Sequence, residues 1–190
     1  FNIQDLQPLT VNLNDFNETP ENKEQKIFPI LPVRNMVMFP KVVIPITAGR
    51  EMSIKLLEEA QRNNEFIGIL SQNNSTIDQP TFKDLYQIGT LAKIVKIIKL
   101  PDGNTTAITR GFQRFKIKNF TTAKPYFKAE ITKLKDIKKK KTEEYNALLE
   151  NIKDLALKII ELDPNIPNAA NFAIKNMSDH EDLLNFICTN

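Results

Sequence analysis

The sequence predicts an α+β protein, with a β-rich unit at residues 27–136 and a helical unit at residues 137–190. Between residues 27 and 134, short runs rich in Ile and Val alternate with Pro, Gly and Asn, which is typical of strands and turns. After residue 142 apolar residues recur at i, i+3, i+4 and i+7, which indicates an amphipathic helix. With 190 residues, 41% of them hydrophobic, the chain can bury the core of one globular domain and a smaller appendage.

The first 26 residues differ in composition from the rest of the chain. They are rich in Asn, Asp, Glu and Gln, carry a net charge of −3, and keep no regular apolar period. We interpret residues 1–26 as a disordered acidic leader. The chain starts at Phe1 rather than at a methionine, and its last helical pattern runs to Asn190, so we expect a piece of a longer protein.

Short β-branched runs begin at Ile27. The segments Ile27–Val33 and Val42–Thr47 are interrupted by proline, which suits edge strands because proline cannot donate a ladder hydrogen bond. Residues Arg34–Lys41 form the loop between them. Phe66–Leu70 is typical of a buried strand, and Ser71–Lys83, with its Asn, Asp and Pro residues, is typical of a loop.

A short helix is expected before the third strand. Between Arg50 and Asn63, four apolar residues fall on one broad helical face: Met52, Leu56, Leu57 and Ala60. We therefore predict a helix that covers one face of a sheet.

Residues 88–120 carry the clearest hairpin pattern. Two β-rich runs flank Pro101–Asn104, where proline presets one backbone angle and Gly103 accepts a positive one. In the second run Phe115 and Ile117 alternate with basic residues, which predicts a core face and a solvent face. A further strand is expected within Pro125–Leu134.

Three helices are expected in the C-terminal unit. Thr142, followed by two glutamates, is a favourable helix start because carboxylates are stabilised at the positive end of the helix dipole. Residues 166–177 predict a shorter second helix, and Ser178 with Glu181 predicts a capping box that starts the third. The first helix has one strongly apolar face, which comprises Tyr145, Leu148, Leu149, Ile152, Leu155, Ala156, Ile159 and Ile160.

Scarce residue types exclude several kinds of chemistry. The five glycines are scattered singly, so they form neither a P-loop nor a dinucleotide-binding turn. Cys188 is the only cysteine and His180 the only histidine, which excludes an internal disulfide and leaves too few ligands for an ordinary zinc site. Within one predicted helix these two residues lie too far apart for a nucleophile and its base. Ser53 and Lys55 point apart on the short helix predicted between Arg50 and Asn63, so they are badly placed for a Ser-Lys dyad. We expect no catalytic residue, metal site or cofactor within these residues.

Targeting signals are missing from the sequence as well. No run approaches the roughly 18 apolar residues of a membrane span, and the first 26 residues lack the pattern of a signal peptide. We therefore expect a cytoplasmic protein with no membrane partner.

The net charge of +3 conceals a strong segregation of charge. Residues 83–141 contain 16 Lys and Arg against four Asp and Glu, a net charge of +12, whereas residues 142–190 carry −6.

One strand of the basic block has the pattern that a platform for single-stranded RNA would need. Basic residues flanked by aromatic residues share one face of this strand, and the face comprises Phe112, Arg114, Lys116, Lys118 and Phe120. The alternative is an amphipathic strand with a solvated outer face. Lys138–Lys141 is interpreted as a charged connector.

The segment Asn35–Pro40 is apolar where a loop between two strands should be polar. Its Met36, Met38 and Phe39 can adapt to varied apolar ligands, because thioethers are flexible and polarizable. We consider two interpretations, an adaptable surface for unfolded polypeptide or a loop packed into its own core.

Two stretches of the chain carry recognisable motifs. Leu31–Ala60 has the sequence LPVRNMVMFPKVVIPITAGREMSIKLLEEA, and Ile88–Ile117 contains G-T-x-A, L-P-D-G and G-x-x-R in order. The first stretch closely resembles the start of the amino-terminal domain of Lon proteases, and the second resembles the later hairpin of that domain. Ile166–Asn190 is similar to its helical segment, so the likeness covers about residues 27–190. One departure is Lys41, where many members have glycine or histidine.

The resemblance implies a PUA-like β-rich domain followed by part of a helical bundle. It also implies a non-catalytic region that recognises misfolded or damaged proteins and assists a homohexamer, within an ATP-dependent serine protease of the stress response. The ATPase module, with ATP and Mg, and the Ser-Lys dyad would lie outside this chain. The alternatives are a PUA-like RNA-binding module and a stand-alone substrate receptor with a Lon-type domain.

Overall fold

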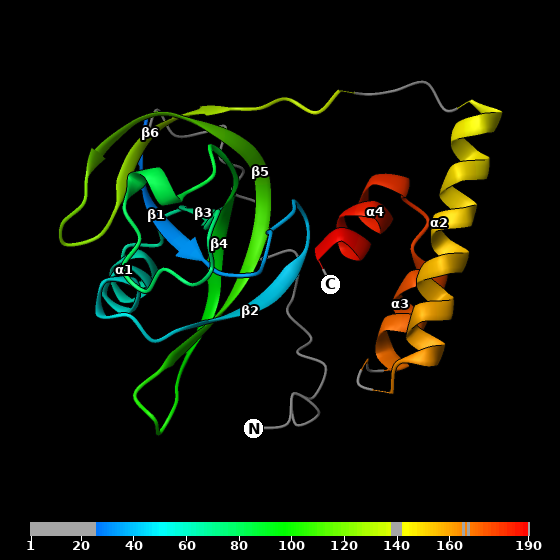
Figure 1. Cartoon of the computed structure of the whole chain (residues 1–190), viewed down its shortest axis with the longest axis horizontal. Helices are drawn as coiled ribbons and strands as arrows, with labels where there is room; N and C mark the ends of the chain where they lie inside the picture. Colours follow the sequence, from blue (N-terminus) through cyan, green and yellow to red (C-terminus); the bar gives the residue numbers. More distant parts are fainter. Residues whose placement is uncertain (1–25, 138–141, 165, 167, 190) are drawn as a thin grey trace. The chain divides into compact units, whose positions relative to one another are not determined.

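The computed structural model describes residues 26–137, 142–164, 166 and 168–189. The predicted leader, apart from Lys26, and the basic connector Lys138–Lys141 lie outside the described residues. The chain divides into two compact units, one within Pro20–Asp136 and one within Ile137–Ile187, which we call the barrel unit and the helical unit (Figure 1).

Six strands of the barrel unit form one sheet that closes on itself. The sheet order is β2-β5-β4-β3-β1-β6, and β6 also pairs with β5, which makes the closure (Figure 1). Only β1 and β3 are parallel, and the chain between them contains α1, Glu51–Arg62. The strands are β1 (Ile27–Val33), β2 (Val43–Ala48), β3 (Ile67–Ser71), β4 (Ile88–Lys99), β5 (Thr105–Thr122) and β6 (Lys128–Lys133).

Strand β5 is the longest element of the sheet, with 18 residues. Its first half pairs with β2 and β4, and its second half with β4 and β6. The predicted turn before it is confirmed, because Gly103 adopts a φ of +84° and its N–H donates to the carbonyl of Leu100 at 3.1 Å. The sheet also contains register shifts, where β5 carries an extra residue at Phe112 and another at Lys118.

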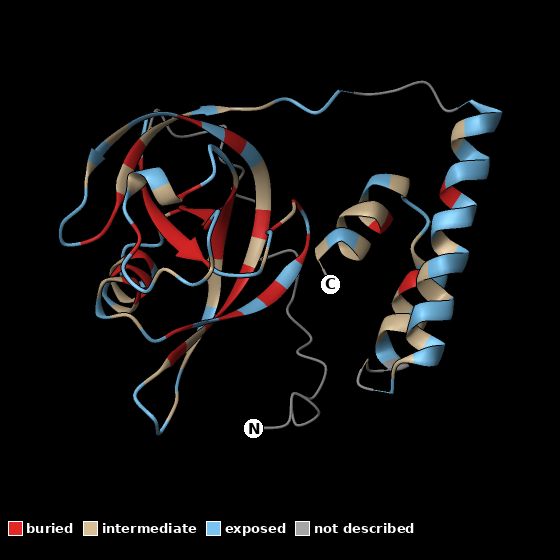
Figure 2. Cartoon of the chain, viewed as in Figure 1, coloured by how far each residue is buried: buried red, intermediate tan, exposed pale blue. Residues whose placement is uncertain are grey.

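Apolar side chains are buried on both faces of β1 and β3 (Figure 2). On one face Leu31, Val33, Ile67 and Ile69 form a cluster with the predicted helix, whose Leu56, Leu57 and Ala60 are at most 2% exposed. On the other face Ile30, Leu70 and Leu91 surround Phe115. A Cβ on Gly68 would lie 2.8 Å from the Phe115 ring, so this ring fits only against a glycine.

The edge-strand prediction for residues 27–33 is wrong. Strand β1 pairs with β3 on one side and with β6 on the other, and six of its seven residues are buried. Barrel closure turns a proline-containing run into an interior strand, and the pairing needed for that closure is not visible in local sequence. Strand β2 pairs only with β5 among the described strands, which confirms the prediction there.

Three helices form the helical unit: α2 (Glu143–Leu162), α3 (Asn168–Asn176) and α4 (His180–Thr189). The hydroxyl of Thr142 accepts a hydrogen bond from the Tyr145 N–H at 3.1 Å, which confirms the predicted start of α2. The predicted cap of α4 is wrong by one residue, because Asp179 rather than Ser178 accepts from the Asp182 N–H at 3.0 Å. No helix of the described residues is long and apolar enough to cross a bilayer.

Candidate functional site

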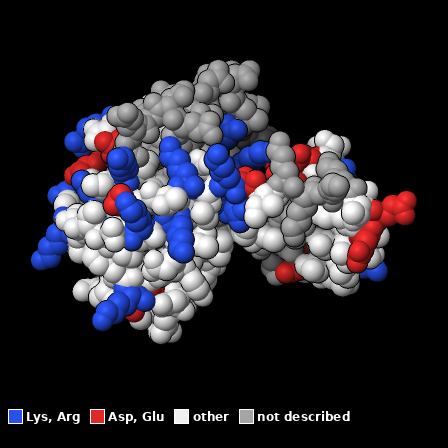
Figure 3. Space-filling model, turned by 90° about the horizontal axis from the view of Figure 1, so that it is seen from above, with Lys and Arg blue, Asp and Glu red and all other residues white. Residues whose placement is uncertain are grey.

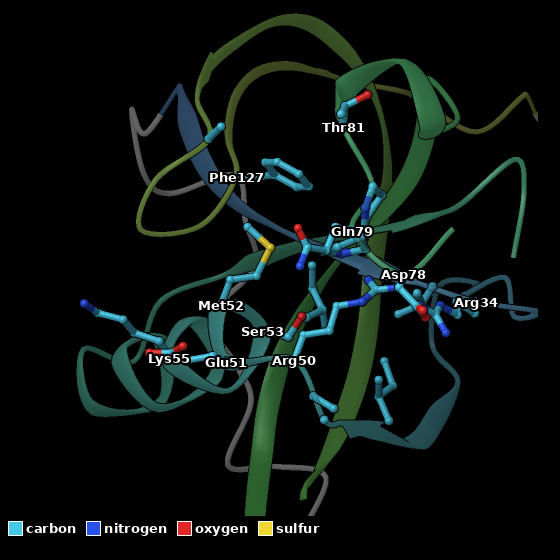
Figure 4. A pocket seen from close by; sticks show the side chains of 18 of the residues that line it. Arg34, Arg50, Glu51, Met52, Ser53, Lys55, Asp78, Gln79, Thr81 and Phe127 are labelled. Carbon is cyan, nitrogen blue, oxygen red and sulfur yellow. The ribbon is translucent and has the colours of Figure 1, made fainter. Parts of the chain in front are cut away.

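A groove of about 1630 Å³ opens in the barrel unit beside the first turn of α1 (Figure 4). Its walls come from four separated segments of the chain, within residues 31–36, 46–55, 78–82 and 123–127. The groove therefore depends on the closed fold, since the end of β1, the end of β2, a long loop and the β5–β6 connection must meet to build it.

One part of the groove is apolar. Met52 and Phe127 point toward one another in Figure 4, Met52 from the first turn of α1 and Phe127 from the residue before β6. Phe82 and Met36 also line the groove, and both are partly buried. A half-buried thioether beside aromatic rings is an adaptable apolar surface, because the unbranched methionine side chain can follow the shape of its ligand.

The other part of the groove is cationic. Arg34 forms an ion pair with Asp78 at 2.8 Å and also donates to the carbonyl of Ile77 at 3.1 Å. Arg50, the residue before α1, donates instead to the neutral side-chain amide oxygen of Gln72. Burial, with the like charge of Arg34 second, lowers the pKa of the Arg50 guanidinium, so its environment disfavours the positive charge.

The loop beside Arg50 is held by its own hydrogen bonds. The amide nitrogen of Gln72 donates to the carbonyls of Asn74 at 3.1 Å and Ile77 at 3.0 Å. At the far end, the backbone N–H and the hydroxyl of Thr81 both donate to the Asp84 carboxylate at 2.7 Å, and they lower its pKa. This capping box starts a 3-10 helix, Phe82–Asp84 (η4), which overlaps the end of the predicted loop Ser71–Lys83.

The three residues predicted to contact substrate, Met36, Met38 and Phe39, have different surroundings in the structure. Met38 is 3% exposed and belongs to the core, where Thr90 donates to its carbonyl at 2.6 Å and Thr109 contacts its sulfur at 3.8 Å. Phe39 packs against the same core cluster. Met36 also packs against this cluster, and its side chain lines the groove as well. The loop packed into its own core, one of the two interpretations, is therefore what the structure shows for Met38 and Phe39.

The residues of the predicted nucleic-acid face do not all lie on one exposed surface. Arg114 and Lys118 are exposed and pair with Asp136 at 3.1 Å and Glu130 at 2.8 Å, and Lys116 is exposed beside them. Phe112 instead packs edge-on against Phe66, with ring centroids 5.2 Å apart.

Phe120, at the far end of the same strand, stacks on Phe82 with a centroid distance of 4.3 Å. Both phenylalanines pack against the core cluster of Phe115, because each lies at or beyond a register shift of β5 that reverses the facing of side chains.

Among the groove residues, the sequence patterns predicted a ligand contact only for Met36. Arg34 lies in an apparent loop, Arg50 before a helix, and Phe127 in a strand pattern that suggested only packing. One signal was available, since both arginines lie inside the motif of residues 31–60 on which the family resemblance rests. Ser53 and Lys55 line the groove too, but Ser53 is buried and Lys55 exposed, and Figure 4 shows Lys55 pointing away from Ser53.

Comparison with known proteins identifies the family. The family model of the ATP-dependent protease La (LON) substrate-binding domain matches residues 27–190. The chain belongs to this family. It is 42% identical to a Lon protease of Flavobacterium johnsoniae over 90% of the chain, and 41% identical to a Lon protease of Cytophaga hutchinsonii over 91%. These alignments cover 22% of each relative, so the chain spans about a fifth of the length of the curated Lon proteases it matches.

Solved structures of Lon amino-terminal domains share the fold. The N-terminal domain of a Mycobacterium avium complex Lon protease superposes with a TM-score of 0.64 at 22% identity, covering 84% of this chain and 80% of that one. A Lon N-terminal domain protein of Xanthomonas campestris gives a TM-score of 0.54 at 15% identity, covering 84% and 95%. The α+β class and the Lon resemblance predicted from the sequence are both confirmed.

Proposed function

We propose that this chain is the substrate-capturing region of an ATP-dependent Lon protease, and that its groove binds exposed apolar segments of unfolded polypeptides. The groove itself is the observation that supports this most. Its volume of about 1630 Å³ exceeds the roughly 300–1,000 Å³ of pockets that enclose small molecules, which favours a longer ligand. Its lining combines the partly buried Met36, Met52 and Phe82 with the buried ring of Phe127, and the methionines make this apolar surface adaptable to segments of varied sequence.

Hydrolysis would belong to parts of the protein outside this chain. As the resemblance implies, those parts would bind ATP and Mg, carry a Ser-Lys dyad and assemble as a hexamer in the cytoplasm. Six weak grooves on one ring would raise the avidity for a long unfolded chain by on the order of 10² to 10⁴, because later contacts become intramolecular.

A single substitution in the groove tests the proposal. M52S removes an apolar side chain that is only half-buried, and we expect the affinity for a fluorescent, permanently unfolded protein to fall about fivefold, as the lost apolar area implies. Y86S is the matched control, since Tyr86 is an exposed ring, 56% accessible, outside the groove. Equal anisotropy titrations for the two variants would contradict the proposal.

A second variant uses the one predicted contact that lies in the groove. M36S should weaken capture as M52S does. Met36 and Met52 pack against the core cluster from partly buried positions, so circular dichroism must show that M36S and M52S retain the fold. Replacing Met38 and Phe39 as well would be uninformative, because Met38 is a buried core residue and the triple variant would lose stability.

Nucleic-acid binding through Arg114, Lys116 and Lys118 stays the alternative prediction. It requires binding of single-stranded RNA that weakens steeply with salt and weakens further in K116Q. A flat titration at low salt would remove it. A stand-alone receptor is distinguished from a protease by whether the reading frame encodes a P-loop and a Ser-Lys region.

A further inference from the structure

We propose that the groove prefers polypeptide segments in which an acidic side chain lies close to apolar ones, and that Arg50 receives the carboxylate. This inference rests on the proposed function and specifies the class of segment that the groove selects. Arg50 lies two residues before Met52 at the start of α1, so both could contact one short segment.

The balance of charge in the groove favours an anionic ligand. Four cations line it, Arg34, Arg50, Lys55 and Lys124, against two acids, Glu51 and Asp78. Figure 3 shows Lys and Arg side chains spread over one face of the barrel unit.

Arg50 differs from Arg34 in its partners. The Arg34 guanidinium already pairs with the Asp78 carboxylate at 2.8 Å, whereas the acceptor described for Arg50 is the neutral Gln72 amide. A guanidinium has five N–H donors in a planar fork that fits a carboxylate, so Arg50 retains donors for a ligand. Partial burial and the like charge of Arg34 raise the free energy of the charged Arg50 guanidinium, and the Asp78 carboxylate offsets part of this. An incoming carboxylate would lower that free energy further.

The geometry places the charge beside the apolar surface. In Figure 4 the Arg50 side chain extends from the start of α1 toward Asp78 and Gln79, while Met52 extends toward Phe127. Side chains two positions apart on an extended segment share one face and are about 6.6 Å apart along the chain, so an acidic residue and an apolar residue at this spacing can reach both parts.

Arg50 also has a structural role that the test must separate from binding. Its bond to Gln72 connects α1 to the loop that Gln72 holds, so a variant could weaken binding simply by loosening the groove wall. A loosened wall would weaken the binding of every segment alike. Loss of a carboxylate contact would weaken only acidic segments.

The experiment uses the whole chain and three fluorescent 12-residue peptides with blocked ends. The peptides share the same apolar residues and differ at one central position, which is Glu, Gln or Lys. We expect the Glu peptide to bind about fivefold more tightly than the Gln peptide at low salt, and the Lys peptide to bind most weakly. R50Q should bring the affinity for the Glu peptide to that for the Gln peptide, R50K should keep part of the preference, and added salt should reduce it.

K96Q is the control, because Lys96 is an exposed cation outside the groove and its variant should keep the wild-type ratio. A Glu-to-Gln ratio near one in the wild type, equal weakening of all peptides by R50Q, or loss of the preference in K96Q would each overturn the carboxylate site. The Gln peptide tests the proposed function separately. If it binds and M52S weakens it, capture of apolar segments stands even where the charge preference fails.

Discussion

Helices α1 and α2 are both amphipathic, but the described residues cover the apolar face of α1 and only part of the apolar face of α2. In α1, Leu56, Leu57 and Ala60 are at most 2% exposed against the sheet. In α2, the buried residue is Leu149, packed with Ile174 of α3 and Leu183 of α4. Five further apolar residues of α2 are 39–83% exposed: Leu148, Ile152, Leu155, Ile159 and Leu162.

The difference shows what an apolar period does and does not determine. The spacing identifies which side chains share a face of the helix, and in α1 that face is buried as predicted. In α2 the predicted face is divided, because Leu149, Ala156 and Ile160 pack on α3 and α4 while the exposed residues do not. Whether a second surface covers the face depends on tertiary structure. The exposed residues of α2 alternate spacings of four and three, which is the seam pattern of a coiled coil rather than the broad stripe of a helix on a sheet.

The largest expected effect tests this contrast directly. L57A in α1 should lower the free energy of unfolding by about 2–5 kcal/mol, because it leaves a cavity at a fully buried position. L155A in α2, at a residue 59% exposed, should change it by at most about 0.5 kcal/mol. Urea unfolding followed by circular dichroism measures both. Similar losses for the two variants would show that the seam of α2 is covered in solution.

A second prediction concerns a polar contact that fixes α1. The hydroxyl of Tyr126 donates to the Glu59 carboxylate of α1 at 2.7 Å, and burial together with this bond raises the pKa of Tyr126 to about 12. The Tyr126 phenol loses its proton near pH 10 in the unfolded chain, but only at higher pH in the folded chain. The contribution of Tyr126 to the free energy of unfolding is therefore fully present below pH 10 and is lost as pH rises toward 12. The fall should be on the order of 1 kcal/mol.

Y126F should flatten this alkaline decline, measured as the urea midpoint at pH 9, 10 and 11. Y86F serves as the control and should decline as the wild type does. A decline of equal slope in Y126F would mean that the Tyr126–Glu59 bond does not couple α1 to pH.

A smaller effect is expected where the barrel unit contains backbone strain. The described residues with positive φ all belong to this unit, and Lys41 is among them at +66°. Its N–H donates to the Gly111 carbonyl at 2.9 Å, which keeps the loop beside the sheet. K41G should raise the free energy of unfolding by about 0.5–1 kcal/mol, since glycine adopts this angle without steric conflict. A melting temperature that falls in K41G would contradict this account.

The smallest expected effect is weak association through α2. We expect concentration-dependent self-association of the chain in sedimentation velocity, because exposed apolar side chains at seam spacing are an interaction surface. L148K/L155K should shift the distribution toward monomer without loss of helix. A strict monomer at high concentration in the wild type would show that α2 does not act as a seam.

The local sequence pattern was enough to predict most helices and strands, but it was not enough to predict the groove. The hairpin turn at Gly103 and the start of α2 at Thr142 follow from short-range chemistry, so their residues predict them. The groove needs Arg34, Arg50 and Phe127 to converge from distant parts of the chain, and no local rule specifies that convergence. The extra residue at Phe112 likewise changes the facing of side chains without any preceding signal in the sequence.

Closure of the barrel has a consequence for synthesis of the protein. Ile27 of β1 pairs with Glu130 of β6, about 100 residues later in the chain. A ribosome adds roughly 5–20 residues each second, so β1 remains without its β6 partner for several seconds after it emerges. During that time its unpaired backbone and apolar side chains can bind a chaperone or another nascent chain. This domain thus resembles, early in its own synthesis, the unfolded chains that we propose it binds.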